Sequence, residues 1–174
     1  MKTFFYMHKR IWHFSTFVLV LILIGCTIIL SEKYSYLQNT YNLKQQQMDS
    51  KLYFLLNDVV IDWNFNKMTT SQKMSALLND AANLHCADTI SSLCSCKELF
   101  NSGNYPLSLA FTQLEKDLTS MAQGNIDIPK KLLQAYYKSI SKLALKLNQY
   151  NSNPGEAKEA ADNFGKLVLE NHIS

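Results

Sequence analysis

The chain has 174 residues, of which 17 are basic and 14 are acidic, so its formal charge at pH 7 is +3. That excess comes from Lys2, Lys9 and Arg10, the only charged residues before Glu32, while the 14 later Lys balance the 14 acidic residues. The part of the chain beyond residue 30 is therefore neutral, which argues against a nucleic-acid-binding protein with a basic surface.

A membrane-length apolar run, IWHFSTFVLVLILIGCTIIL, occupies residues 11–30 directly after Lys9 and Arg10. These 20 residues would cover about 30 Å as a helix, the thickness of the hydrocarbon core of a bilayer. Basic residues flank the cytoplasmic end of such spans. We therefore expect a cytoplasmic tail over residues 1–10, a transmembrane signal-anchor over 11–30 and export of the remaining 144 residues.

The same run also resembles a lipoprotein signal. Its segment LIGC, which ends at Cys26, resembles a bacterial lipobox, in which the chain is cleaved before a cysteine that then carries lipid. Apolar residues continue past Cys26 to Leu30, and the run is longer than the roughly 7–15 apolar residues of a signal peptide. These two facts favour the uncleaved anchor, and lipidation of Cys26 remains the alternative.

The amino-acid usage indicates a bacterial source. One Arg stands against 16 Lys, which is typical of an AT-rich genome, and no asparagine lies in an N-x-S/T glycosylation site. We predict a protein of the bacterial inner membrane, with its N-terminus in the cytoplasm and its C-terminal domain in the periplasm or outside the cell.

A long membrane-proximal helix is predicted over residues 31–62. Gly and Pro are absent between Gly25 and Gly103, and apolar residues recur at steps of three, four and seven, with an interruption at 44–47. The spacing fits the core-facing side of a bundle helix better than a coiled coil, which remains the alternative. Trp63 and Phe65 follow this helix and would either close the base of the bundle or contact a partner. The predicted stripe consists of Tyr34, Leu37, Tyr41, Met48, Leu52, Leu55 and Val59.

Residues 69–174 predict an exported helical bundle. Thr69 and Gln72 fit a capping box, Pro106 and Pro129 suit helix starts, Gly124 suits a left-handed helix end, and residues 153–156 (NPGE) form another start signal. A short helix fits residues 93–100. The fold class is all-α, with a single N-terminal transmembrane helix followed by an antiparallel bundle of about four to five helices. The predicted inward-facing residues are Met74, Leu77, Leu78, Ala81 and His85; Leu107, Phe111, Leu114, Leu118 and Met121; Leu132, Leu133, Tyr136, Tyr137, Ile140, Leu143, Ala144 and Leu147; and Ala157, Ala160, Ala161, Phe164, Leu167 and Val168.

Three cysteines, Cys86, Cys94 and Cys96, gather in the connection after the second predicted helix. An exported domain meets an oxidising compartment, so we expect Cys86 to form a disulfide with Cys94 or Cys96. Closing so short a loop would stabilise the fold by about 2–3 kcal/mol. Free thiols, or a zinc site that also uses His85, are the alternatives.

A row of lysines that includes Lys138, Lys142 and Lys146 lies opposite the apolar side of the helix predicted after Pro129. Such a face suits anionic lipid head groups or an acidic partner, although most faces of this kind are only solvated. We regard these three lysines, with Trp63 and Phe65, as candidate partner contacts.

No sequence motif points to catalysis. The chain lacks G-x-S-x-G, P-loop, H-E-x-x-H and dinucleotide-binding patterns. We therefore expect no enzyme activity, cofactor, resident metal or nucleic acid, and a small-molecule ligand stays unknown. The predicted function is that of a membrane-anchored envelope protein that binds another protein, for example within a secretion, conjugation or phage-derived assembly. The alternatives are a periplasmic lipoprotein inhibitor or immunity protein, and a sensory or cysteine-based redox domain.

Overall fold

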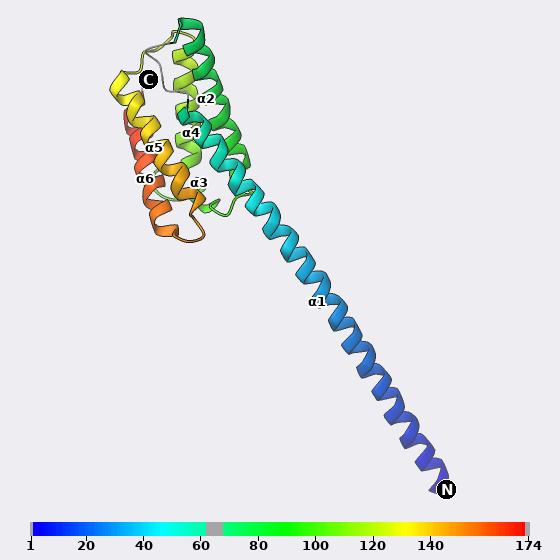
Figure 1. The fold of residues 1–174 in the computed structure, drawn as a ribbon. Coiled ribbons are helices and arrows are strands. Elements are labelled where there is room, and N and C mark those ends of the chain that lie inside the picture. The colour runs from blue at the N-terminus through cyan, green and yellow to red at the C-terminus, as the bar shows by residue number, and fades with distance from the viewer. Residues whose placement is uncertain (1, 62–67, 173–174) are drawn as a thin grey trace. The chain divides into compact units, whose positions relative to one another are not determined.

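The computed structural model describes residues 2–61 and 68–172, and side chains within 16–59 and 68–172. It is 83% helical, and this described part contains six helices and no strand, which confirms the predicted all-α class (Figure 1). The helices are α1 (Lys2–Ile61), α2 (Thr70–Ser91), α3 (Glu98–Asn101), α4 (Leu107–Ala122), α5 (Lys130–Asn148) and α6 (Pro154–Asn171).

Contacts divide the chain into two units, Met1–Leu43 and Lys44–Ser174. The first unit is the N-terminal part of α1. The second contains the rest of α1 together with α2–α6, which form a helical bundle. The described part of α1 ends at Ile61, and Asp62, where the sequence predicts the end of this helix, lies outside the described residues.

Local signals in the sequence begin and end the bundle helices as expected. The backbone N–H of Gln72 donates to the Thr69 hydroxyl at 3.3 Å and the backbone N–H of Thr69 donates to Oε1 of Gln72 at 2.8 Å, which completes the predicted capping box. Gly124 follows α4 with a φ of +75°, a left-handed conformation that glycine adopts without strain. At the start of α6, Oδ1 of Asn153 accepts the backbone N–H of Glu156 at 3.4 Å.

Helix α4 holds the bundle together, since it packs against α2, α3 and α6, while α5 packs against α6. The last two helices lie side by side and run in opposite directions (Figure 1). Three aromatic rings continue this packing through the interior: Phe111 of α4 makes edge-to-face contacts with Phe100 at 5.5 Å and with Phe164 at 5.6 Å between ring centroids.

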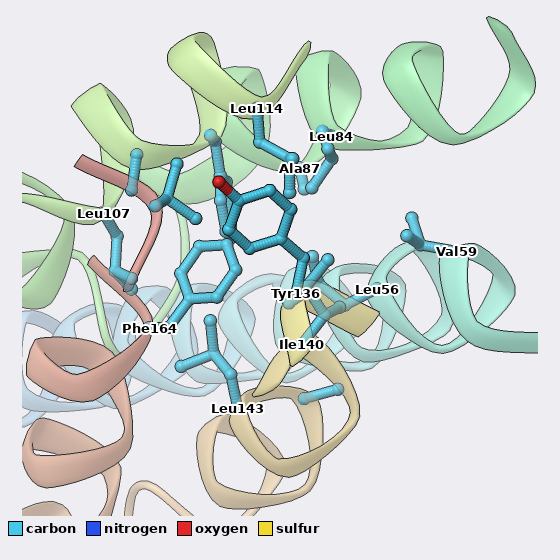
Figure 2. Packing of buried hydrophobic residues seen from close by; sticks show 14 of the residues in the cluster. Leu56, Val59, Leu84, Ala87, Leu107, Leu114, Tyr136, Ile140, Leu143 and Phe164 are labelled. Atoms are coloured by element: carbon cyan, nitrogen blue, oxygen red, sulfur yellow. The ribbon is translucent and has the colours of Figure 1, made fainter. Parts of the chain in front are cut away.

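One continuous core joins α1, α2, α4, α5 and α6 (Figure 2). Tyr136 lies in the middle of this cluster, and Leu56 and Val59 show that α1 contributes to it. The predicted inward faces of α4, α5 and α6 are confirmed, except that Met121, Leu132 and Leu167 are only half-buried.

The prediction for α2 is only partly confirmed: Leu77 and Ala81 are buried as expected, but the rest of the predicted face is wrong. Its buried residues are Ala76, Leu77, Asp80, Ala81, Leu84, Ala87 and Ser91. Met74, Leu78 and His85, which were expected to face inward, are exposed. Asp80 takes a core position, so the inward face of α2 is partly polar and does not coincide with the most apolar face of the helix.

Helix α6 comes unusually close to the loop before α4. A Cβ atom on Gly165 would lie 2.5 Å from the carbonyl oxygen of Tyr105 and 2.7 Å from the Tyr105 Cβ. The Tyr105 hydroxyl donates to Oε1 of Glu170 at 2.6 Å, which ties the same loop to the end of α6. The absence of a side chain at residue 165 is therefore a condition of this packing.

Candidate functional site

The apolar N-terminal stretch of α1 is the first functional feature. Among the described residues, α1 is long and apolar enough to cross a membrane, and the apolar window within it is not buried. Length and composition alone support this assignment, and an N-terminal signal sequence has the same properties. Cys26 lies exposed in this stretch, and nothing lies within 4 Å of a Cβ built on Gly25.

The predicted staple between Cys86 and Cys94 or Cys96 is not present, and all four cysteines are free. Cys86 lies on the exposed side of α2, whereas Cys94 and Cys96, the buried cysteine pair, are in the interior. The physical reason is the register of α2, which directs Ala87 rather than Cys86 into the core. The pair lies in the connection between α2 and α3, which Asp49 of α1 holds by accepting the backbone N–H of Ser95 at 2.8 Å.

The surroundings of the buried cysteine pair disfavour a reactive thiolate. Cys94 donates to the carbonyl oxygen of Ile90 at 3.5 Å. A hydrogen bond with Cys94, followed by burial and by the nearby charge of Asp49, holds the pKa of the Cys96 thiol far above its usual value. A redox-active cysteine needs the opposite, an accessible thiol with a lowered pKa.

No metal site replaces the predicted disulfide in the part of the chain that the structure describes. Within those residues, no three His, Cys, Asp or Glu side chains gather closely enough to hold a metal ion. His85 instead lies beside Glu115 of α4, with Nδ1 at 3.3 Å from Oε2, and its side chain is 67% exposed. This pair is a surface contact between α2 and α4, for which only a small contribution to stability is expected.

The predicted basic face lies on α5, a helix with five lysines and no acidic residue. Lys138 and Lys142 are exposed one helical turn apart, and Leu145 is exposed beside them. Lys146 is half-buried and forms an ion pair with Glu156 of α6, so its charge is used within the domain. That hydrogen bond and charge lower the pKa of Glu156. The exposed lysines in the middle of α5 are therefore Lys138 and Lys142.

Two buried polar arrangements were not anticipated from the sequence. The hydroxyl of Tyr137 on α5 donates to Oδ2 of the buried Asp80 on α2. On α4, Asp117 accepts a hydrogen bond from Nε2 of Gln113 at 2.9 Å, and burial raises the pKa of its carboxyl group. Neither arrangement lines one of the surface hollows described below. The first joins α2 to α5 and the second lies within α4, and a buried carboxylate needs such partners.

Burial also raises the pKa of Tyr136 to about 12, with the charge of Asp117 as the second cause. The Tyr136 hydroxyl donates to the carbonyl oxygen of Asn171 at 3.3 Å and so joins α5 to the end of α6. The only sequence signal for these groups was an aspartate within an otherwise apolar helix face.

Surface hollows in the bundle are shallow and polar at their edges. One of about 290 Å³ lies between the loop before α4 and α6 and is lined by Gly103, Asn104, Tyr105, Lys158, Asp162, Asn163 and Lys166. Another of about 430 Å³ lies at the start of α2. Their residues form no arrangement of nucleophile, base and oxyanion donors of the kind that catalysis uses.

Trp63 and Phe65 lie outside the described residues, so their proposed role as partner contacts stays a prediction. Comparison with known proteins returns no matching family model, no matching curated protein and no matching solved structure.

Proposed function

We propose that the chain is a non-enzymatic, single-span protein of the bacterial inner membrane whose exported helical domain binds another protein. The supporting observation is α1 itself. This one helix contains the exposed apolar stretch and also supplies Leu52, Leu56 and Val59 to the core of the bundle. Because the apolar stretch and part of the bundle core belong to one helix, an anchor in that stretch would tether the domain directly. Tethering restricts the domain to the membrane plane and raises its effective concentration near other membrane proteins.

The basic face of α5 is the proposed partner surface, with Lys138 and Lys142 at its centre. Two exposed lysines one turn apart, without an acidic residue on the same helix, favour a partner with acidic side chains. Charge of this kind chiefly increases the rate of association and makes binding sensitive to salt.

Topology is tested first. A phosphatase fused after Ser174 of the full chain should be active, because that enzyme folds correctly only after export. A fluorescent protein that requires the cytoplasm should be dark at the same position. The reverse pattern would contradict the proposed orientation.

Partner binding is tested by charge reversal in cells. Lys138→Glu with Lys142→Glu should abolish capture of the co-purifying protein after chemical cross-linking, whereas the control pair Lys158→Glu with Lys166→Glu, also exposed lysines but on α6, should not. Capture that resists the α5 reversal, or that both reversals remove equally, would refute the assignment of the surface.

A lipoprotein inhibitor or immunity protein is the second candidate, and the exposed Cys26 after Gly25 favours it. Intact mass of the purified protein distinguishes the two. Retention of residues 1–25, with no change after Cys26→Ala, supports the anchor. Loss of those residues together with added acyl chains supports the lipoprotein. The third alternative is a sensory or cysteine-based redox domain, and the burial and raised pKa of the Cys96 thiol weaken its redox form.

A further inference from the structure

Residues 31–43 of α1, here called the stalk segment, expose large apolar side chains. Tyr34 and Tyr36 are each 71% exposed, and Tyr41 and Leu43 are 55% and 57% exposed. The only charged residues in this segment are Glu32 and Lys33. An isolated helix of this length is marginal in water, and a contiguous apolar surface usually marks a contact site.

Lipid can cover only the lower end of the stalk segment. With Leu30 at the end of the apolar run, Tyr34 lies about 6 Å further along the helix, within a head-group layer roughly 5–8 Å thick. Tyr41 lies about 16 Å beyond Leu30, and an average tilt of about 20° shortens this height by only about 1 Å. Tyrosines suit the head-group layer. Tyr41 lies above this layer, so only a protein surface, and not lipid, could cover its apolar ring.

The spacing of the exposed side chains fits helix pairing. Leu30, Tyr34, Leu37 and Tyr41 follow one another at steps of four, three and four, which puts them on one face. Leu23 and Thr27 continue the same steps into the apolar stretch. Tyr36 and Leu43 lie on the opposite side of the helix, because two residues correspond to a rotation of about 200°.

The occupant that best fits this face is a second copy. A single span holds two copies parallel and at the same height, so identical faces meet in register. In a parallel pair the flanking positions bring Lys33 opposite Gln38 and Thr40 opposite Gln45 of the other copy, so no like charges meet. The next core position is Lys44, whose charge would end the pairing there.

We propose that the face formed by Leu30, Tyr34, Leu37 and Tyr41 pairs with the same face of a second copy, so that the chain is a parallel dimer through α1. The bundle is not needed for this contact. Two short heptads pair weakly in solution, and confinement to the membrane supplies the effective concentration that they require.

Photo-cross-linking tests the proposal with the full-length protein in vesicles of phosphatidylethanolamine and phosphatidylglycerol. Benzoylphenylalanine at residue 34 or 41 should give covalent dimers on illumination. At residue 36 it should give no covalent dimer, because Tyr36 matches Tyr34 in residue type and exposure but lies on the other side of the helix. Dimers from all three positions, or lipid adducts alone, would overturn the proposal. So would a cross-link in cells from residues 34 and 41 to a different protein without any dimer.

Energy transfer between differently labelled copies supplies an independent measurement. Tyr41→Asn should weaken association in the bilayer about tenfold or more, since it removes a large apolar side chain from a core position of the pair. Leu43→Asn is the matched control, because the two residues are equally exposed, and it should leave association unchanged. Equal effects of the two substitutions, or no effect of either, would refute the pairing face. Circular dichroism checks that both variants keep the helical content of the parent.

Discussion

Replacing Gly165 by alanine should destabilise the bundle, although the same change in an ordinary helix interior stabilises by about 1 kcal/mol. Gly165 lies buried inside α6. A Cβ there would approach the Tyr105 carbonyl oxygen to 2.5 Å, far inside van der Waals contact. Tyr105 cannot easily withdraw, because its hydroxyl donates to Glu170 and the first residue after it is Pro106, the cap of α4.

The expected size of the effect follows from two opposing contributions. Overpacking of a filled interior costs about 1–3 kcal/mol, and the helix preference of alanine returns up to about 1 kcal/mol. Gly155→Ala is the matched control, since it lies in the same helix and its nearest neighbour is Asn153 Oδ1 at 3.9 Å, an ordinary contact. The gain in helix preference applies to both variants, so the difference between them, about 1–3 kcal/mol, measures the clash.

The assay is thermal and urea unfolding of the full chain in mild detergent, followed by circular dichroism. For a domain of this size the difference should lower the melting temperature of Gly165→Ala by roughly 2–12 °C relative to Gly155→Ala. Equal or higher stability of Gly165→Ala would refute the close approach of α6 to the loop at Tyr105.

Three further predictions concern the interior. In the native protein Cys86 should react with maleimide within minutes, while the buried cysteine pair stays protected until urea is added. A disulfide mapped from Cys86 to Cys94 or Cys96 would contradict the register of α2. Tyr137→Phe removes the donor to buried Asp80 and should cost about 1–3 kcal/mol in urea unfolding, whereas an unchanged midpoint would refute a role for that hydrogen bond. Burial raises the pKa of the Asp117 carboxyl group above its usual 3.8, so the folded state binds this proton more tightly than the unfolded state. The free energy of unfolding should therefore fall as the pH rises from the usual to the raised pKa. Asp117→Asn should flatten that part of the curve of stability against pH, and an unaltered curve would contradict the prediction.

The sequence predicts the elements of this fold well because their signals are local. A capping box at Thr69, a left-handed glycine at residue 124 and the asparagine at 153 act on backbone groups within a few residues. The apolar arcs of α4, α5 and α6 are regular, so their inward faces could be read from spacing alone. Such patterns need no knowledge of the neighbouring helices.

The failures occur where the deciding partner is distant in the sequence. Asp80 occupies a core position because Tyr137, 57 residues later, supplies a hydrogen bond, and this shifted the predicted face of α2 and misassigned His85. The predicted disulfide failed for the same reason, since the register of α2 decides where Cys86 points. The close approach of Gly165 to Tyr105 leaves no pattern in the sequence either.

The apolar stripe of α1 shows how one sequence pattern leads to two outcomes. Leu52 and Val59 were predicted from the same spacing as Tyr34 and Tyr41, yet the first two are buried in the bundle and the other two are exposed. The spacing of apolar residues identifies the face of a helix that makes contacts. It does not show whether the contacting residues come from the same chain or from another molecule. For Leu52 and Val59 the chain supplies them itself, in the core cluster that α1 shares with the bundle. Under the pairing proposed above, a second copy of α1 supplies the cover for Tyr41 and the upper stalk segment. An anchor that only tethered a domain would need no such face, whereas the proposed pairing of α1 would give this surface a role.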